Sequence, residues 1–165
     1  MAPDLPPTTI RVPITLWANV IFAMRRRSQG HAESGVFLLG SQKGTIGKVT
    51  QYVCFDDLDP NAYQNGGIAF HANGLAALWE RCRTKDVQVL ADVHTHPTSD
   101  VRQSHIDRRH PMIPIVGHTA LIVPNFARTA WWTLRGIGTY EYLGNLNWRT
   151  HEPSGPSRRL NLSLW

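Results

Sequence analysis

The chain has 165 residues, of which 42% are hydrophobic and 18% are charged, and its formal net charge is +5. This length suits one domain with a buried core, and the composition excludes an intrinsically disordered chain. Apart from three consecutive arginines at 25–27 and two arginine pairs, the basic residues are scattered along the chain, so we do not expect nucleic acid as a partner.

No uninterrupted apolar stretch approaches the roughly 18 residues that a membrane-spanning helix needs. Residues 1–9 include three prolines and an acid, and they lack the basic and apolar regions of a secretory signal. We therefore expect a cytoplasmic protein with no membrane association. The cysteines, Cys54 and Cys82, are expected to be reduced thiols, because two are too few for a disulfide framework and they form no Cys-x-x-Cys pair.

The first half of the chain predicts alternating strands and helices. Apolar residues recur every three or four positions where a helix is expected, and short apolar runs between turn residues indicate strands. The segment 56–67 is rich in Asp, Asn, Gly and Pro and predicts an exposed loop. The expected strands are 8–13, 36–39, 46–55 and 68–70, and the expected helices are 16–27 and 75–82.

The second half of the chain continues this alternation and completes a mixed α/β domain. Its most apolar, β-branched segment predicts a central strand. The expected strands are 87–93, 119–123 and 130–142, with a polar loop at 97–103 and a short helix at 104–110. We therefore predict a single α/β domain over residues 1–148, with a mixed sheet flanked by helices, and a peripheral tail over residues 149–165 that contains two prolines and a glycine.

Two histidines follow the predicted central strand and indicate a metal site. Side chains alternate along a strand, so His94 and His96 face the same side of the sheet and can converge on one ion. Pro97 ends the strand because it cannot donate to the ladder. Ligands at a strand end can face a cleft that a substrate enters.

A catalytic zinc ion takes three protein ligands and keeps a fourth position open for water. Asp107 is the natural third ligand, because the loop and the helical turn after Pro97 bring the chain back. Such a site also needs a general base, and Glu33, just before a predicted buried strand, is a candidate. Spacing alone does not select Glu33 over Glu80 or Asp92.

These residues resemble the motif of the JAMM (JAB/MPN-plus) family of zinc isopeptidases. That motif has an upstream Glu, then His-x-His-Pro, then a Ser-x-x-Asp whose Ser follows the second His after seven residues. Here His94-Thr95-His96-Pro97 is followed at this spacing by Ser104 and Asp107. The upstream segment Glu-Ser-Gly-Val-Phe-Leu-Leu-Gly begins at Glu33 and is similar to the family's strand entry. Every motif position is matched, and the predicted elements over residues 8–148 are compatible with the family's domain.

The resemblance implies a role for each motif residue. His94, His96 and Asp107 would bind one Zn²⁺ per chain. Glu33 would take the proton of the attacking water and give it to the leaving amine, and Ser104 would donate to the oxyanion of the tetrahedral intermediate. The family cleaves isopeptide or peptide bonds after the C-terminal Gly of ubiquitin or ubiquitin-like proteins, which would be the partner of this chain.

The short chain looks like the bacterial and archaeal members of the family. Some of these lie in operons with ubiquitin-like proteins and their conjugating enzymes, including antiviral ones, and others release sulfur-carrier proteins. The sequence does not choose between these contexts, between precursor processing and deconjugation, or between oligomeric states. A non-catalytic scaffold of the same fold is a further alternative, although such relatives usually lack one or more motif residues.

Other functions of the motif residues stay open. Ser104 and Asp107 also match the pattern that caps a helix N-terminus, and both functions can hold at once. His105 and His110 flank Asp107 and are alternative ligands. His105 should point to a different helix face from Asp107, whereas His110, three residues after it, shares that face and is a candidate to support the site.

Overall fold

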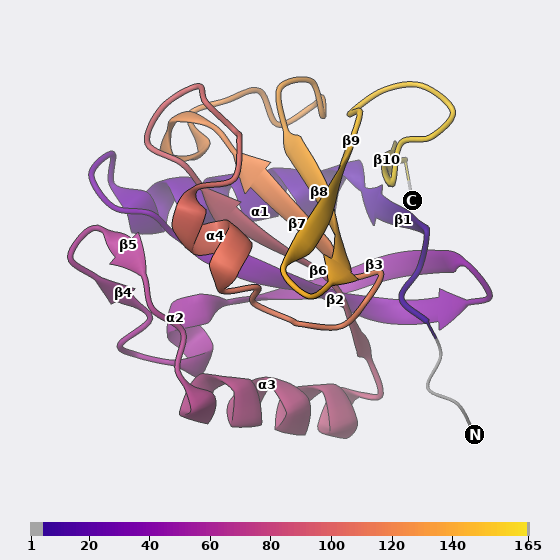
Figure 1. Cartoon of the computed structure of the whole chain (residues 1–165), viewed down its shortest axis with the longest axis horizontal. Coiled ribbons are helices and arrows are strands. Elements are labelled where there is room, and N and C mark those ends of the chain that lie inside the picture. Colours follow the sequence, from indigo (N-terminus) through magenta and orange to yellow (C-terminus); the bar gives the residue numbers. More distant parts are fainter. Residues whose placement is uncertain (1–4, 165) are drawn as a thin grey trace.

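An eight-stranded mixed sheet forms the centre of the protein (Figure 1). The computed structural model describes residues 5–164; the outer ends of the predicted domain and tail, residues 1–4 and 165, lie outside them. The strands of this sheet are β1 (Thr9–Pro13), β2 (Gly35–Lys43), β3 (Ile46–Cys54), β6 (Gln88–Thr95), β7 (Thr119–Val123), β8 (Gly138–Gly144), β9 (Asn147–His151) and β10 (Leu160–Ser163).

The strand order is β10-β1-β3-β2-β6-β7-β8-β9. Three neighbouring pairs are parallel (β10–β1, β1–β3 and β6–β7), and the other four are antiparallel. This arrangement confirms the predicted α/β class with a mixed sheet flanked by helices. The remaining elements are α1 (Ile14–Ser28), α2 (Phe55–Leu58), α3 (Ala72–Lys85), α4 (His105–Arg109), the 3₁₀ turn η1 (Asn125–Ala127), and a small hairpin of β4 (Tyr63–Gln64) and β5 (Gly67–Ile68).

The two long helices cover opposite faces of the sheet. In β2, Val36 and Leu38 belong to the buried cluster that contains the apolar face of α1. The alternating residues Phe37 and Leu39 belong to a second cluster, which contains Leu78 of α3. Because successive strand residues face opposite sides, β2 can be apolar throughout its first half and still pack on both helices.

The strand β6 carries His94, ends one residue before His96, and lies in the middle of the sheet. It pairs antiparallel with β2 and parallel with β7, and its residues from Leu90 onward are buried. Val93 packs in the cluster under α1, so its neighbours Asp92 and His94 face the other side of the sheet. The sheet therefore fixes the direction of the histidines from both edges of β6.

Three expectations about elements are wrong. The segment 56–67 is not simply an exposed loop, because α2 ends in it, β4 lies in it, and Asp59 and Ala62 are buried. The strand expected at 130–142 begins only at Gly138, after turns around residues 131–136. Residues 149–165 are not a peripheral tail, since β9 continues to His151 and β10 pairs with β1 in the main sheet.

Buried Arg159 explains why the C-terminal segment docks on the domain. Its guanidinium donates to Thr119 Oγ1 at 2.9 Å and to the carbonyls of Pro7 and Gly117, and it lies 3.2 Å from a carboxylate oxygen of Glu141. A buried charge needs such a set of partners. Among the described residues, no helix is both long and apolar enough to cross a membrane.

Candidate metal centre

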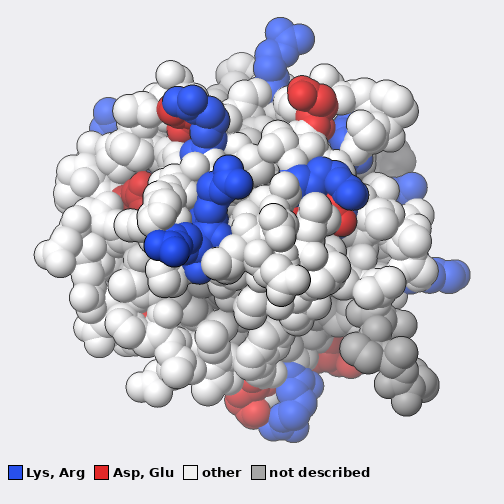
Figure 2. All heavy atoms as spheres, in the orientation of Figure 1, with Lys and Arg blue, Asp and Glu red and all other residues white. Residues whose placement is uncertain are grey.

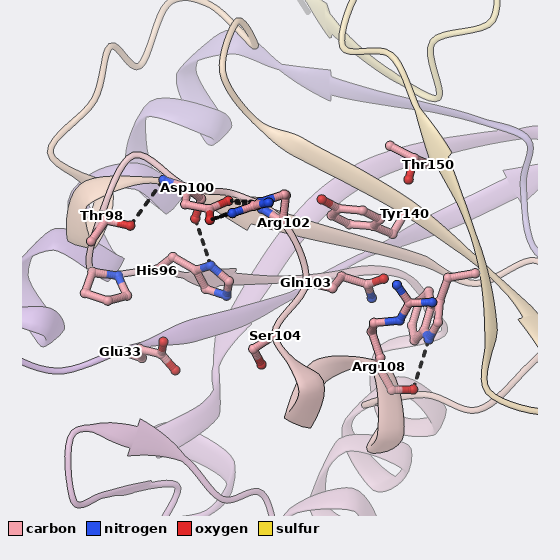
Figure 3. A pocket seen from close by; sticks show the side chains of 12 residues that line it. Glu33, His96, Thr98, Asp100, Arg102, Gln103, Ser104, Arg108, Tyr140 and Thr150 are labelled. Carbon is pink, nitrogen blue, oxygen red and sulfur yellow. Dashed lines mark hydrogen bonds and ion pairs between the residues drawn. The ribbon is translucent and has the colours of Figure 1, made fainter.

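A cleft of about 700 Å³ opens where β6 ends (Figure 3). One wall is the loop 97–103, which continues into α4, and another comes from β8 and β9. Glu33, His96 and Ser104 all line this cleft, so the structure brings together three of the residues that the motif singled out. The other lining residues are Pro97, Thr98, Asp100, Arg102, Gln103, Arg108, Tyr140, Trp148 and Thr150.

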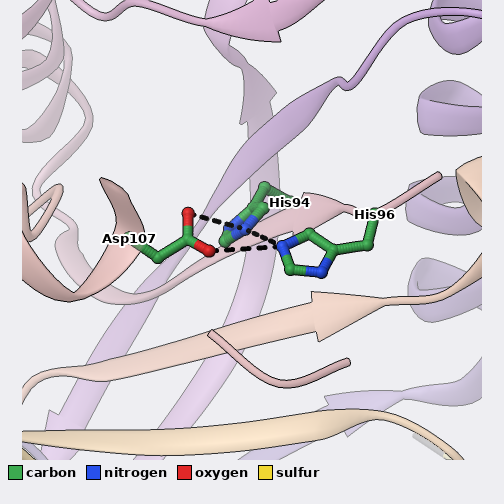
Figure 4. Close-up of side chains that lie close together, drawn as sticks. All are labelled: His94, His96 and Asp107. Atoms are coloured by element: carbon green, nitrogen blue, oxygen red, sulfur yellow. Dashed lines mark hydrogen bonds and ion pairs between the residues drawn. The ribbon is translucent and has the colours of Figure 1, made fainter. Parts of the chain in front are cut away.

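The three predicted metal ligands converge at the edge of this cleft (Figure 4). The Nε2 atoms of His94 and His96 are 3.3 Å apart. Asp107 Oδ1 lies 3.3 Å from His94 Nε2, and Asp107 Oδ2 lies 3.2 Å from His96 Nε2. His94 and His96 are buried, and the Asp107 side chain is 19% exposed. The cluster is therefore largely shielded from water yet reachable from the cleft.

These separations fit a tetrahedral metal ion. Ligand atoms about 2.0–2.1 Å from a zinc ion, at tetrahedral angles, lie about 3.3–3.4 Å from one another. The Nε2 atoms of His94 and His96 lie 3.3 Å apart, and each lies 3.2–3.3 Å from a different carboxylate oxygen of Asp107. The set of two imidazoles and one carboxylate is also one that catalytic zinc uses. The three residues can thus hold a metal ion with little rearrangement.

His96 is held in the tautomer that a metal ligand needs. Its Nδ1 lies 3.0 Å from the carbonyl oxygen of Asp100, which can only accept, so Nδ1 carries the proton and Nε2 keeps its lone pair. Burial alone would lower the pKa of His96. Hydrogen bonds with the Asp107 carboxylate and the Asp100 carbonyl outweigh burial and raise it. Protons therefore compete with a metal ion for Nε2 as the pH falls.

Asp107 is oriented by a capping box at the start of α4. The Asp107 N–H donates to Ser104 Oγ at 3.1 Å, and the Ser104 N–H donates to Asp107 Oδ2 at 2.7 Å. Burial alone would raise the pKa of Asp107, but hydrogen bonds with His94 and His96 hold it well below its usual range. The predicted cap is thus confirmed. Because Ser104 Oγ accepts here, its hydroxyl proton remains free to donate into the cleft.

Glu33 is anchored to the end of β6 through Ser34, its neighbour in the sequence. Ser34 N–H donates to Thr95 Oγ1 at 3.0 Å, and Thr95 N–H donates to the Ser34 carbonyl at 2.9 Å. Ser34 Oγ is also 2.8 Å from Ser28 Oγ of α1, and Glu33 N–H donates to the Gly66 carbonyl at 2.9 Å. Thr95 lies between His94 and His96, so these bonds fix the backbone at Glu33 relative to the candidate metal centre.

Gly35, the residue after Ser34, has to be glycine. A Cβ atom on Gly35 would overlap the ring of Phe55. The Tyr63 hydroxyl holds the same glycine by accepting from its N–H and donating to its carbonyl, both at 3.1 Å. The hairpin of β4 and β5 therefore helps to position Glu33 through Gly35 and Gly66.

The environment of Glu33 suits a proton acceptor. Burial raises its pKa, and the nearby imidazoles of His94 and His96 lower it in part. The structure also separates Glu33 from the two other acids that spacing left open. Asp92 is buried and lies 2.7 Å from His118 Nε2, and Glu80 pairs with Arg83 on the surface of α3. Glu33 is the one of these three that lines the cleft.

Some residues of the site had no sequence signal of their own. Ser34 and Thr95 act through backbone contacts, and Arg108 and Trp148 reach the cleft from α4 and β9. His110 borders a small cavity together with His94 and Asp107, although its ring forms no hydrogen bond with a described residue. His105 is exposed and borders neither this cavity nor the cleft.

No protein-family model matches the chain. It is similar in structure to a protein from Desulfitobacterium hafniense, with 17% identity over 94% of this chain and 95% of that one and a TM-score of 0.64. A protein from Salinibacter ruber has 15% identity over 86% of this chain and 88% of its own, with a TM-score of 0.57. A JAB1/MPN domain protein from Archaeoglobus fulgidus has 15% identity over 93% of this chain and 98% of its own. Its TM-score of 0.49 is too low to carry an argument. At such identities, the first two matches show a shared fold alone.

Proposed function

We propose that this chain is a zinc-dependent isopeptidase or peptidase of the JAMM type, which cleaves after the C-terminal Gly of a ubiquitin-like protein. The observation that carries the proposal is the convergence of a complete motif: three ligands with separations of 3.2–3.3 Å, with Glu33 and Ser104 lining the cleft beside them. The substrate class comes from the resemblance of this motif. The bacterial setting, including antiviral operons and sulfur-carrier release, is part of the same proposal.

His94, His96 and Asp107 would hold the ion and leave one side of it facing the cleft. Zinc bound in this way supplies a Lewis acid that lowers the pKa of water to about 7 and polarises a carbonyl. The hydrogen bond from His96 Nδ1 to the Asp100 carbonyl, at 3.0 Å, keeps that ring in orientation.

Glu33 would accept a proton from the attacking water and deliver it to the leaving nitrogen. A carboxylate does this best when its pKa approaches the working pH, and burial shifts the pKa of Glu33 in that direction. The bonds between Ser34 and Thr95 hold the backbone beside Glu33, from which this side chain reaches the cleft.

Ser104 would stabilise negative charge on the scissile carbonyl oxygen. Its hydroxyl lines the cleft, and the capping bond from the Asp107 N–H leaves the hydroxyl proton available. A donor aimed at this oxygen in the transition state is a common source of rate enhancement.

The test is cleavage of a panel of ubiquitin-like and sulfur-carrier proteins by the zinc-reconstituted chain. Each panel member carries either a linear peptide after its C-terminal Gly or a lysine-linked one, and mass spectrometry identifies the product. We expect at least one member to be cut after Gly and the activity to be lost with a chelator and restored by zinc. Failure of the zinc-loaded protein on every member would support the non-catalytic scaffold, and cleavage that ignores the chelator would contradict the metal mechanism.

A further inference from the structure

The cleft contains one cationic side chain that has no counter-charge. Arg102 and Asp100 neutralise each other through contacts of 2.6–3.1 Å between guanidinium and carboxylate. The guanidinium of Arg108, in contrast, forms no hydrogen bond or ion pair with any residue in the described range 5–164. The unpaired charges along the cleft wall are therefore the carboxylate of Glu33 and the guanidinium of Arg108.

The backbone of Arg108 is held rigidly beside the metal centre. Arg108 follows the ligand Asp107 in α4, and Trp148 of β9 donates from Nε1 to the Arg108 carbonyl at 3.1 Å. The Trp148 ring packs edge-on against Tyr142, with centroids 5.0 Å apart. The side chain of Arg108 thus starts from a fixed point, and in Figure 3 it lies across Ser104 from Glu33 and His96.

The rest of this wall favours a negatively charged ligand group. Gln103 and Thr150 are neutral, and the Tyr140 hydroxyl is already donating to the Val101 carbonyl at 2.6 Å. Figure 2 shows Lys and Arg side chains spread over this face, including the part over α4, with acidic side chains beside several of them. The net charge of +5 favours the approach of acidic molecules.

A guanidinium matches a carboxylate well because it can donate two parallel hydrogen bonds to it. We propose that Arg108 determines substrate specificity by pairing with a carboxylate that flanks the scissile amide. This inference rests on the proposed peptidase function and names its substrate class, an acidic peptide. The carboxylate comes either from an Asp or Glu side chain or from a free chain end, and the two sources share the same chemistry.

The test compares short peptides that differ in a single charge. One pair has Gly-Gly-Asp or Gly-Gly-Asn at its centre, and a second pair ends shortly after Gly-Gly in a free carboxylate or in an amide. Dissociation constants are measured on chelator-treated protein, so that the carboxylate cannot bind a metal ion, and kcat/KM is measured on the zinc-loaded protein. The indole N–H signal of Trp148 in NMR spectra reports binding directly beside Arg108.

We expect wild-type protein to bind the acidic member of at least one pair about three- to tenfold more tightly than its neutral partner. Arg108→Gln should abolish this preference. Arg109→Gln is the matched control, because Arg109 is the next residue of α4, is exposed and does not line the cleft, so it should keep the preference. The pair that shows the preference identifies the source of the carboxylate.

Equal binding of both members of each pair, no measurable binding of any acidic peptide, or a preference that survives in Arg108→Gln would each overturn the inference. The proposed function fails separately. If binding of acidic peptides depends on Arg108 but no peptide is hydrolysed, the carboxylate-binding role of Arg108 is supported and the peptidase function is contradicted. Hydrolysis of acidic and neutral peptides at the same kcat/KM would support the peptidase function and contradict the role of Arg108 in specificity.

Discussion

Two clusters of metal-ligand side chains lie in the described part of this protein, and they differ in what surrounds them. His94, His96 and Asp107 form one, and Cys54, Asp56 and Asp57 form the other. In each cluster the candidate ligand atoms lie within 4.8 Å of one another. Proximity and residue type alone would therefore rank the two clusters alike.

The second cluster already contains a cation of the protein. Arg27 Nε lies 2.6 Å from Asp56 Oδ1, and Arg27 Nη2 lies 3.2 Å from Asp57 Oδ1. Burial raises the pKa of the Cys54 thiol to about 11, although Arg27 opposes the shift. The carboxylates are thus satisfied by a guanidinium, and the sulfur is a neutral thiol at physiological pH, which is a poor ligand.

Among the described residues, no Lys or Arg forms an ion pair with the first cluster. The Asp107 carboxylate contacts the two imidazoles and the N–H of Ser104, and His96 Nε2 is left with its lone pair toward the centre. The two clusters therefore differ less in their candidate ligands than in whether a protein cation already lies among them. Each of the following experiments tests this contrast.

The largest expected effect is on metal content. Asp107→Ala should reduce zinc, measured by elemental analysis after gel filtration, from one ion per chain to none, because it removes a ligand. Asp56→Ala is the matched control in the other cluster and should keep the full zinc content. Equal zinc in wild type and Asp107→Ala would contradict the assigned centre. A circular dichroism spectrum unchanged from wild type shows that the variants fold.

Replacement of the base should come next in magnitude. Glu33→Gln should keep zinc and lower kcat by about 10²–10⁴, since an amide cannot take the proton. In wild type, kcat/KM should fall about tenfold per pH unit once the pH drops below the pKa of Glu33, which burial places above its ordinary value. A Glu33→Gln protein with near wild-type kcat would remove Glu33 from the mechanism.

Ser104→Ala separates the two functions of that hydroxyl. We expect normal zinc content and a kcat lower by about 10²–10³, the usual effect of losing one oxyanion donor. The lost cap should also reduce the free energy of unfolding by about 1 kcal/mol. Thr98→Ala, another hydroxyl of the same cleft, serves as the control. A destabilised Ser104→Ala protein with unchanged kcat would show that Ser104 caps the helix and has no catalytic function.

The smallest effect should appear in the cluster that Arg27 already neutralises. With a pKa of about 11, roughly 0.1% of Cys54 is thiolate at pH 8, so iodoacetamide should label it far more slowly than in the unfolded chain. Mass spectrometry measures this labelling, and Cys54→Ala should leave zinc content unchanged. Rapid labelling of the native protein would show that the sulfur is exposed or ionised and would make the two clusters more alike.

The convergence of His94, His96 and Asp107 can be predicted from the sequence because their geometry is local. His94 and His96 share a face through the period of a strand, and Asp107 follows in a turn that its own capping box closes. The expectations about the cysteines agree with their burial as free thiols. For His94, His96 and Asp107, the spacing within one short segment is enough to predict that the side chains converge.

The positions that were mispredicted, or that the sequence left open, depend on partners far away in the sequence. The segment of β10 follows two prolines and a glycine, and only its parallel pairing with β1 makes it a strand. Glu33 could not be separated from Glu80 or Asp92, because its place depends on the bonds between Ser34 and Thr95, 61 residues apart. Aromatic residues at 131–132 resemble a strand, yet turns with Gly136 at φ 83° delay β8 to Gly138.

The pairing of Ser34 with Thr95 has a consequence for how much the protein would rearrange during catalysis. Because Thr95, between His94 and His96, holds the backbone next to Glu33, the segments that carry the proposed base and the proposed histidine ligands are tied directly to each other. Little protein reorganisation would then accompany proton transfer, and the adjustments would fall on the incoming substrate. A site built in this way discriminates by what can fit between fixed groups, so its selectivity should resist changes in loops distant from the cleft.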